Sequence, residues 1–340
     1  MLALTIVIIL IALVFDFLNG MNDAANSIAT VVSTRVLSPK LAVAWAAFFN
    51  FIAAFGFGVA VAKTIGKGIV DPAVVTQELI LAALVGAIVW THLCTQYGLP
   101  ISVSHSLIGG LVGAAIAKEG FHVLVVSGIT KVVVFIFLSP IIGLFVALFL
   151  MVAVSWVFRR WAVQKVDRIF RIGQLVSSAA FSLGHGTNDA QKTMGIIAVL
   201  LFTTNAELPT WLYDQAQGFY VPYWVILAAH FSIGLGTLIG GWKVVRTMGI
   251  KLTHLKPVGG FCAEGAGALV LLGTALSGIP VSTTHTIAGA IMGVGSVRRI
   301  SAVRWGIAGK IVAAWILTIP TSALVAGMVY WLIEVLFLTS

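Results

Sequence analysis

The stretch Gly20–Ser27, with the sequence GMNDAANS, decides the fold of this chain because it recurs as Gly186–Thr193, with the sequence GTNDAQKT. Each copy places an Asn-Asp pair inside a long apolar segment. An ionisable side chain inside a membrane is costly unless another group compensates it, so such a residue usually marks a functional site. Carboxylates at matched positions of two halves predict a transport site between internal repeats.

The composition is that of a membrane protein. Of the 340 residues, 60% are hydrophobic and 9% are charged, with a mean hydropathy of +1.08, whereas soluble domains have roughly 45–50% apolar and about 25% charged residues. Crossing a bilayer takes roughly 20 apolar residues. We therefore expect an all-α polytopic membrane protein, whose apolar stretches include Met1–Leu18, Leu41–Ala62, Val123–Val157, Val221–Trp242 and Trp305–Leu338.

The net charge of +9 predicts membrane topology rather than nucleic-acid binding. The connection Thr203–Gly218 contains acidic residues and no Lys or Arg. Basic residues gather in other short connections: Arg35 and Lys40; Arg159, Arg160, Lys165, Arg168 and Arg171; Lys243, Arg246, Lys251 and Lys256; Arg298, Arg299 and Arg304. Because Lys and Arg are retained on the cytoplasmic side, we expect the basic connections on the cytoplasmic side of the inner (plasma) membrane. We expect both termini on the outer side.

Further landmarks support an internal duplication. The segment Gly98–Ser106 (GLPISVSHS) resembles Gly278–Thr286 (GIPVSTTHT), and a later proline recurs as well. The halves are offset by 166 residues at the Asn-Asp pair (188 − 22) and by 180 at the prolines (280 − 100 and 320 − 140). Landmarks in the same order at a nearly constant offset indicate a repeat.

Threading the chain between the charged connections gives each half an odd number of crossings, so the second half runs upside down. We expect a first inverted repeat at residues 1–158, a basic cytoplasmic connection at 159–171 and a second inverted repeat at 172–340. In each repeat we expect a first helix interrupted at the Asn-Asp motif, where Gly20 or Gly186 permits a break, and then a helical hairpin. The charges leave open whether the hairpin legs span the membrane or stop halfway.

The two motifs supply complementary chemistry. Asn and Asp oxygens are hard ligands that suit Na⁺ or accept a proton. The hairpin prolines favour a turn followed by a helix start, where exposed N–H groups and hydroxyls bind anions. The predicted anion-binding residues are Ser102, Ser104, Ser106, Ser282, Thr283, Thr284, Asn22 and Asn188, and the predicted cation-binding or coupling residues are Asp23, Asp189, Asn22, Asn188, Asn26, Lys192 and Glu264. Together they predict a cation-coupled oxyanion symporter.

Some polar residues keep more than one interpretation. His105 and His285 recur within the hairpin motif and either orient the hydroxyl-rich helix start or make a structural hydrogen bond. The other intramembrane histidines, His185 among them, have weaker claims. Glu264 has no counterpart in the first half, and it either binds a cation, relays a proton or pairs with a basic residue.

At these residues the chain resembles the inorganic phosphate transporter (PiT) family of cation-coupled symporters, as a short prokaryotic member. That family has a Gly-x-Asn-Asp-x-x-Asn/Lys signature in each inverted half and a Pro-x-Ser-x-x-His motif in each hairpin. The resemblance extends from Asp16 to the last helix. It implies phosphate held near the membrane midplane by the hydroxyl-rich helix starts, Na⁺ sites at Asp23 and Asp189, no cofactor beyond the coupling ion, and a homodimer.

The resemblance leaves the coupling ion open between Na⁺ and H⁺, because some relatives couple to protons, accept metal-phosphate complexes or carry sulfate. One departure from symmetry is that Asn26 of the first motif corresponds to Lys192 of the second. We expect Lys192 to place a fixed positive charge near the anion or to replace one cation site.

Three other functions fit parts of the pattern. A sulfate symporter of the same architecture is the nearest, since hydroxyls and helix starts bind any tetrahedral dianion. An intramembrane Mg²⁺-dependent enzyme acting on a diphosphate would need several carboxylates within a helical turn, and each motif has one Asp. A passive channel does not need inverted repeats. We therefore expect a transporter and no enzyme.

Overall fold

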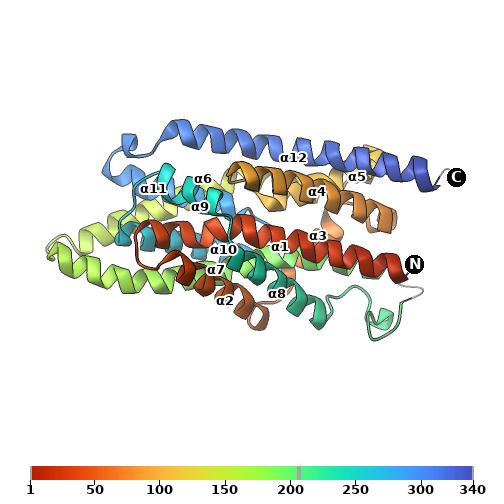
Figure 1. Ribbon diagram of the computed structural model, residues 1–340, viewed down its shortest axis with the longest axis horizontal. Coiled ribbons are helices and arrows are strands. Elements are labelled where there is room, and N and C mark those ends of the chain that lie inside the picture. Colours follow the sequence, from red (N-terminus) through yellow and green to blue (C-terminus); the bar gives the residue numbers. More distant parts are fainter. Residues whose placement is uncertain (1, 205–207, 339–340) are drawn as a thin grey trace.

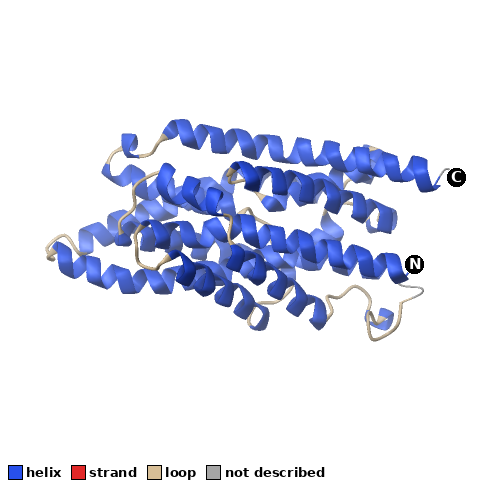
Figure 2. Cartoon of the chain, in the orientation of Figure 1, coloured by secondary structure: helices blue, strands red, loops and turns tan. Residues whose placement is uncertain are grey.

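The structure is a computed structural model, which describes residues 2–204 and 208–338. These residues form helices joined by short loops, and no strand occurs among them (Figure 2). Five helices are long and apolar enough to cross a membrane, or seven spans if each of two bent pairs counts as one. The helices are α1 Leu2–Ser33, α2 Pro39–Ile52, α3 Ala60–Gly68, α4 Gln77–Tyr97, α5 Val103–Glu119, α6 Val126–Val157, α7 Val163–Thr203, α8 Tyr223–Ile239, α9 Trp242–Arg246, α10 Pro257–Leu276, α11 Thr283–Arg298 and α12 Trp305–Ile333.

The predicted interruption of each first helix is wrong. Helix α1 continues unbroken through the first Asn-Asp motif, and α7 through the second. The upstream glycines instead allow close packing. A Cβ on Gly20 would lie 2.1 Å from the carbonyl oxygen of Ile233 in α8, and one on Gly186 would lie 2.6 Å from that of Asn50 in α2. Glycine is required here because a neighbouring backbone occupies the space of a side chain.

The helix breaks lie one element later, in the second helix of each half. The helical stretch Pro39–Phe55 meets α3 at 82°, and α8 meets the stretch Trp242–Lys251 at 64°. Glycines disfavour helix at both breaks, and Gly240 adopts a left-handed φ of 72°. Gln191 accepts hydrogen bonds from the backbone N–H groups of Val61 and Ala62 at 2.8 and 3.2 Å. The second Asn-Asp motif thus supplies a partner for N–H groups that the break frees inside the membrane.

The two predicted hairpins are present, and their turns meet. Helices α4 and α5 form the first, and α10 and α11 the second. The Thr284 hydroxyl donates to the carbonyl oxygen of Ile101 at 3.0 Å, so the turn of one hairpin touches the turn of the other. Figure 1 shows α5 toward the end that holds both termini and α11 toward the opposite end. Hairpins that lie toward opposite ends of the molecule therefore make contact near their tips.

The last helix of each half packs on the hairpin of the other half. A Cβ on Gly113 of α5 would lie 2.0 Å from the carbonyl oxygen of Ala323 in α12. Likewise, one on Gly293 of α11 would lie 2.2 Å from that of Leu144 in α6. Small residues let transmembrane helices approach this closely. The exchange of α6 and α12 between halves ties the two halves into one unit.

The arrangement is the one that inverted repeats predict. Helix α1 runs away from the end that holds the termini, and α7 runs back toward it (Figure 1). The elements of the two halves follow in the same order: a long helix, a bent pair, a hairpin and a last helix. The boundary at residue 158 directly follows α6, whereas residue 172 lies inside α7, which begins at Val163; both boundaries stay predictions.

Candidate functional site

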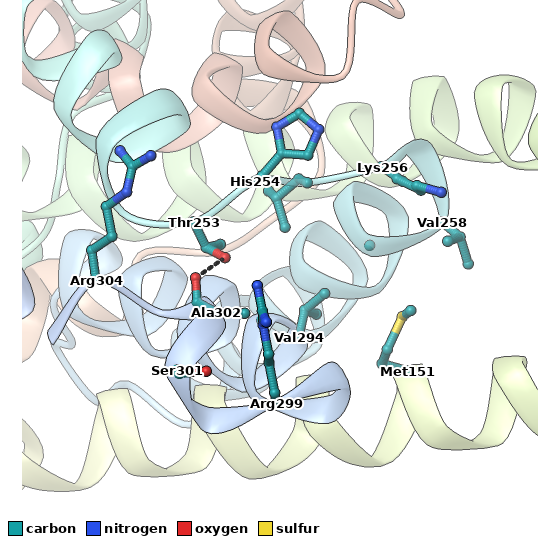
Figure 3. A pocket seen from close by; sticks show the side chains of 13 residues that line it. Met151, Thr253, His254, Lys256, Val258, Val294, Arg299, Ser301, Ala302 and Arg304 are labelled. Atoms are coloured by element: carbon teal, nitrogen blue, oxygen red, sulfur yellow. Dashed lines mark hydrogen bonds between the residues drawn. The ribbon is translucent and has the colours of Figure 1, made fainter.

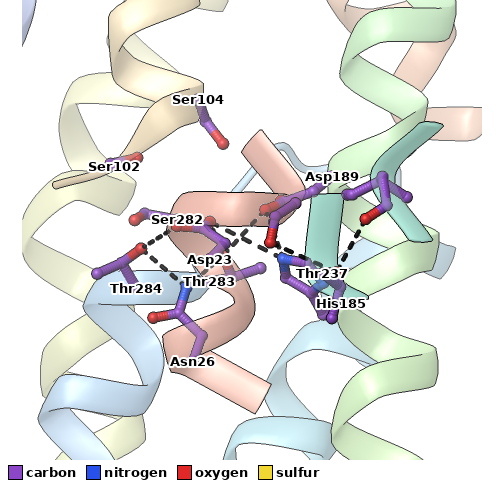
Figure 4. A network of polar contacts seen from close by, with 12 residues as sticks. Asp23, Asn26, Ser102, Ser104, His185, Asp189, Thr237, Ser282, Thr283 and Thr284 are labelled. Atoms are coloured by element: carbon purple, nitrogen blue, oxygen red, sulfur yellow. Dashed lines mark hydrogen bonds and ion pairs between the residues drawn. The ribbon is translucent and has the colours of Figure 1, made fainter. Parts of the chain in front are cut away.

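The two Asn-Asp motifs face each other at the start of the second hairpin helix. The hydroxyl of Thr283 lies 3.1 Å from Asp23 Oδ2 and 3.0 Å from Asp189 Oδ2, so it connects the two carboxylates (Figure 4). Neither Asp side chain is more than 2% exposed. Three elements far apart in the sequence, α1, α7 and α11, therefore meet at two buried acids.

Lys192 neutralises the second of these acids. Its ammonium group is paired with Asp189, three residues earlier on α7. It also donates to the Ser104 hydroxyl at 2.5 Å and to the carbonyl oxygen of Val281 at 2.8 Å. Lys192 thus joins α7 to the tips of both hairpins. A buried ammonium needs this full set of partners because each unpaired donor would be costly.

Asn26 takes the corresponding place in the first motif. Its amide Nδ2 donates to the hydroxyl of Thr284 at 2.9 Å and lies 3.4 Å from that of Thr283. The Thr284 hydroxyl in turn lies 3.3 Å from Asp23 Oδ1. Asn26 Oδ1 is buried and has no hydrogen-bond partner among the described residues. The first motif consequently presents an uncharged amide where the second presents an ammonium group.

The predicted hydroxyl-rich helix starts divide into two roles. Ser102 and Ser282 cap α5 and α11, each accepting from the backbone N–H three residues later at 3.3 and 3.2 Å. Ser106 bonds back to its own helix, to the Ser102 carbonyl at 3.5 Å. Ser104, Thr283 and Thr284 instead face the acidic motifs. Caps that fix a helix start also orient its free N–H groups.

The motif asparagines Asn22 and Asn188 are buried beside the acids. Asn22 donates to the Thr95 hydroxyl of α4 at 2.7 Å, while its Oδ1 has no partner among the described residues. Neither polar atom of the Asn188 side chain has such a partner. Buried amides without partners are rare in folded proteins and call for an explanation. The polar atoms of these two side chains are therefore candidate ligand groups.

His185 belongs to the site, although its sequence position gave it only a weak claim. Its Nε2 lies 3.4 Å from Asp189 Oδ2 and 3.9 Å from Asp23 Oδ2. Its Nδ1 lies 3.0 Å from Asn50 Oδ1. Ligand atoms of Asp23, His185 and Asp189 all lie within 4.8 Å of one another, close enough to share a cation. The signal in the sequence was the spacing, since His185 precedes Asp189 by four residues, one helical turn.

Asp16 is a second residue that the sequence analysis did not assign. It lies on α1 two turns before Asp23, is fully buried, and accepts a hydrogen bond from the Thr193 hydroxyl of α7 at 2.9 Å. Its Oδ2 has no hydrogen-bond partner among the described residues. A third carboxylate thus extends the acidic face of α1 beyond the motif.

Glu264 forms a separate polar cluster near the other end of α1. Its Oε1 accepts from the Thr30 hydroxyl at 2.5 Å and from Gln174 Nε2 at 3.0 Å, and its Oε2 accepts from the Ser177 hydroxyl at 2.5 Å. None of the ion pairs among the described residues includes Glu264. Pairing with a basic residue is therefore not its role here. Two hydroxyls, an amide and a carboxylate make an oxygen-rich cluster of the kind that holds a cation or a proton.

His105 and His285 form part of the contact between the hairpin tips. Their rings pack edge to face with centroids 4.8 Å apart, and His285 also stacks on Trp315 at 3.7 Å. His285 Nδ1 lies 3.2 Å from the carbonyl oxygen of Ile136. Both rings thus position the helix starts by packing, while neither contacts Asp23 or Asp189.

The site is closed to solvent. Among the predicted site residues, the most exposed is Ser104 at 6%. A separate cavity of about 540 Å³ is lined in part by basic residues (Figure 3). The side chains of His254, Lys256, Arg299 and Arg304 are exposed there. That cavity lies at a connection predicted to be cytoplasmic, and no predicted site residue lines it.

The chain is similar to known proteins along most of its length. A model of the phosphate transporter family matches residues 19–326. The chain belongs to this family. It is 56% identical over 324 residues to a probable low-affinity inorganic phosphate transporter of Rhizobium meliloti (strain 1021), with 95% of each chain covered. It is 42% identical over 339 residues to one of Bacillus subtilis (strain 168), with 99% of each covered.

A solved structure is also similar. It is described as the sodium-dependent phosphate transporter, and it superposes with a TM-score of 0.88 at 26% sequence identity, covering 98% of this chain and 100% of the other. The resemblance inferred from the Asn-Asp and hairpin motifs is therefore confirmed. The family match includes both motifs and both hairpins.

Proposed function

We propose that this protein is a secondary active symporter that moves inorganic phosphate into the cell together with Na⁺ or H⁺. The observation that supports the proposal most strongly is the convergence of Asp23, Asp189 and the start of α11 at one buried point. Charged groups at such depth in a membrane protein are characteristic of substrate and ion pathways. The names of the relatives agree with phosphate as the substrate.

Phosphate binds between the starts of α5 and α11 in this proposal. Both helix starts are capped, so their free N–H groups and positive dipole ends are fixed in direction. Ser104, Thr283 and Thr284 add hydroxyls beside them. A hydroxyl group can donate a hydrogen bond to an anion, because it has one O–H donor beside its acceptor lone pairs. The anion then replaces the hydrogen bonds that Thr283 and Thr284 now make with the acids and the one that Ser104 accepts from Lys192.

The coupling cation binds on the acidic side of the same point. Asp23 contributes a negative charge that no side-chain ammonium neutralises, and Asn22, Asn26 and Asn188 add amide oxygens without partners among the described residues. A cation there lowers the repulsion between the carboxylates and an arriving phosphate. Binding of each ligand thereby favours the other, which is the thermodynamic condition for coupling.

Glu264 forms a further cation or proton site in this proposal. Its cluster lies along α1 and α7, between the central site and the end of the molecule opposite the termini. An ion entering or leaving by that end meets Glu264 on its way. The central site is closed to solvent in this structure. Transport then requires that the site open to one end of the molecule at a time. We place the termini, which lie at one end (Figure 1), outside the plasma membrane, and we propose a homodimer.

Uptake of labelled phosphate into proteoliposomes tests this function. Purified protein is reconstituted, and Na⁺ and pH gradients are imposed separately, each with and without excess sulfate. We expect phosphate to accumulate against its gradient under one of the two, with little competition from sulfate. Accumulation of sulfate without phosphate would replace the substrate, and equilibration that ignores both gradients would show a passive pathway.

A further inference from the structure

The second half holds a cation of its own. The Lys192 ammonium contacts three oxygen atoms: the Asp189 carboxylate, the Ser104 hydroxyl at 2.5 Å and the Val281 carbonyl at 2.8 Å. Lysine ammonium has three N–H donors, so each oxygen receives one. We call Asp189, Ser104 and Val281 the second cage. The Lys192 ammonium balances the negative charge of this cage, and each of its three N–H groups has an acceptor.

The repeat offsets map the second cage onto Asp23 (189 − 166), Thr284 (104 + 180) and Ile101 (281 − 180). These three residues, which we call the first cage, also come together in the structure. The Thr284 hydroxyl lies 3.3 Å from Asp23 Oδ1 and 3.0 Å from the carbonyl oxygen of Ile101. The residue at the position of Lys192 is Asn26 (192 − 166). The duplication has thus kept three oxygen positions and changed the group that faces them.

The first cage has fewer donors than its acceptors need. The Thr284 hydroxyl carries one proton, which cannot serve both the Asp23 carboxylate and the Ile101 carbonyl at once. Asn26 donates to Thr284 through Nδ2, and its buried Oδ1 has no partner among the described residues. A carboxylate, a hydroxyl and a carbonyl oxygen therefore converge in the first cage with no ammonium group among them. Hard cations bind sets of this kind.

We propose that Lys192 is a tethered counter-cation, whose ammonium group takes in the second cage the place that a mobile coupling cation takes in the first. The chain then moves one cation fewer per phosphate than two mobile sites would allow. Each cage has one carboxylate, so one positive charge balances either. This inference rests on the proposed symport of phosphate. It states that a mobile cation fills one of the two central sites and that Lys192 fills the other.

The test is the accumulation of phosphate in proteoliposomes at zero membrane potential with a tenfold gradient of the coupling ion, Na⁺ or H⁺. One additional coupled cation adds the free energy of one more tenfold gradient, so it raises the limit of phosphate accumulation about tenfold. We expect Lys192→Asn, which supplies an amide oxygen in place of the ammonium, to raise this limit about tenfold. We expect the mirror variant Asn26→Lys to lower it about tenfold.

Two variants serve as controls. Lys192→Met removes the ammonium without supplying an oxygen ligand, so it should not gain the extra cation. Lys131→Asn removes an exposed lysine from α6 and should leave the limit unchanged. If Lys192→Asn does not fold, Asn26→Lys tests the same assignment in the opposite direction.

The proposal is overturned if Lys192→Asn keeps the wild-type limit and only raises the phosphate concentration for half-maximal uptake, because Lys192 would then be a phosphate ligand. It is also overturned if Asn26→Lys keeps the wild-type limit. These results differ from failure of the proposed function, in which the wild-type protein accumulates no phosphate under either gradient.

Discussion

Helices α1 and α7 occupy equivalent places in the two halves, yet they treat charge differently. On α7, Asp189 lies between His185, one turn before it, and Lys192, one turn after it. On α1, Asp16 and Asp23 lie two turns apart, with asparagines at the positions of His185 and Lys192. The two helices carry matched Asn-Asp motifs, but the acid of α7 is paired with a lysine on its own helix and the acid of α1 is not. We therefore expect removal of the acid on α7 to lower stability most, and removal of the acid on α1 to affect mainly the response to ions.

The largest effect is expected for Asp189→Asn. This change leaves the buried ammonium of Lys192 without its carboxylate, and breaking a buried ion pair costs about 3–5 kcal/mol. Thermal unfolding in detergent should occur at a clearly lower temperature, and concentrative uptake should be lost. The double variant Asp189→Asn/Lys192→Asn removes both charges and should recover much of the stability. Additive loss in the double variant would contradict the pairing.

Asp23→Asn should abolish concentrative uptake while keeping the protein folded. Asp23 is held by hydroxyls rather than by an ammonium group, so removing its charge leaves no lysine unpaired. We expect uptake to fall to the level of empty liposomes and the unfolding temperature to stay near that of the wild type. Ion-driven accumulation in this variant would show that the acid of α1 is not needed for the response to ions.

Gly20→Ala and Gly186→Ala compare the packing of the two helices. An added methyl group meets a carbonyl oxygen at 2.1 Å in the first and at 2.6 Å in the second. Overpacking of this kind costs about 1–3 kcal/mol, and the loss of stability should be larger at Gly20. Gly273→Ala in α10 is the control, because nothing lies within 4 Å of its Cβ position. Unchanged unfolding temperatures in both motif variants would show that these glycines do not serve close packing.

The smallest of these effects is expected for Glu264→Gln. The substitution keeps the size of the side chain and removes the charge within the cluster of Thr30, Gln174 and Ser177. We expect the coupling-ion concentration for half-maximal uptake to rise severalfold, with phosphate affinity nearly unchanged. An ion dependence equal to that of the wild type would remove Glu264 from the ion pathway.

The membrane class, the two hairpins and the paired acids could be predicted because each of them corresponds to a local pattern in the sequence. A buried Asp in an apolar segment and a proline before a run of hydroxyls are recognisable without a fold. The helix breaks were misplaced because a glycine beside a motif looks the same whether it ends a helix or admits a neighbouring backbone. Only the position of Ile233 and Asn50 against Gly20 and Gly186 separates the two.

His185 and Asp16 escaped assignment for a related reason. Each lies one or two turns from a motif Asp, and an interruption of the helix at the motif would have removed the helical spacing that brings the two residues to one face. The pairing of Lys192 with the tips of both hairpins could not be seen either, since it depends on contacts 88 and 89 residues away.

The central claim is that the hairpin starts and the Asn-Asp motifs form one site for a tetrahedral anion. A structure determined with arsenate, whose anomalous scattering locates it, tests this most directly. We expect arsenate between the starts of α5 and α11, within hydrogen-bonding distance of the hydroxyls of Ser104, Thr283 or Thr284. Arsenate bound only in the basic cavity beside Lys256 and Arg299 would contradict it.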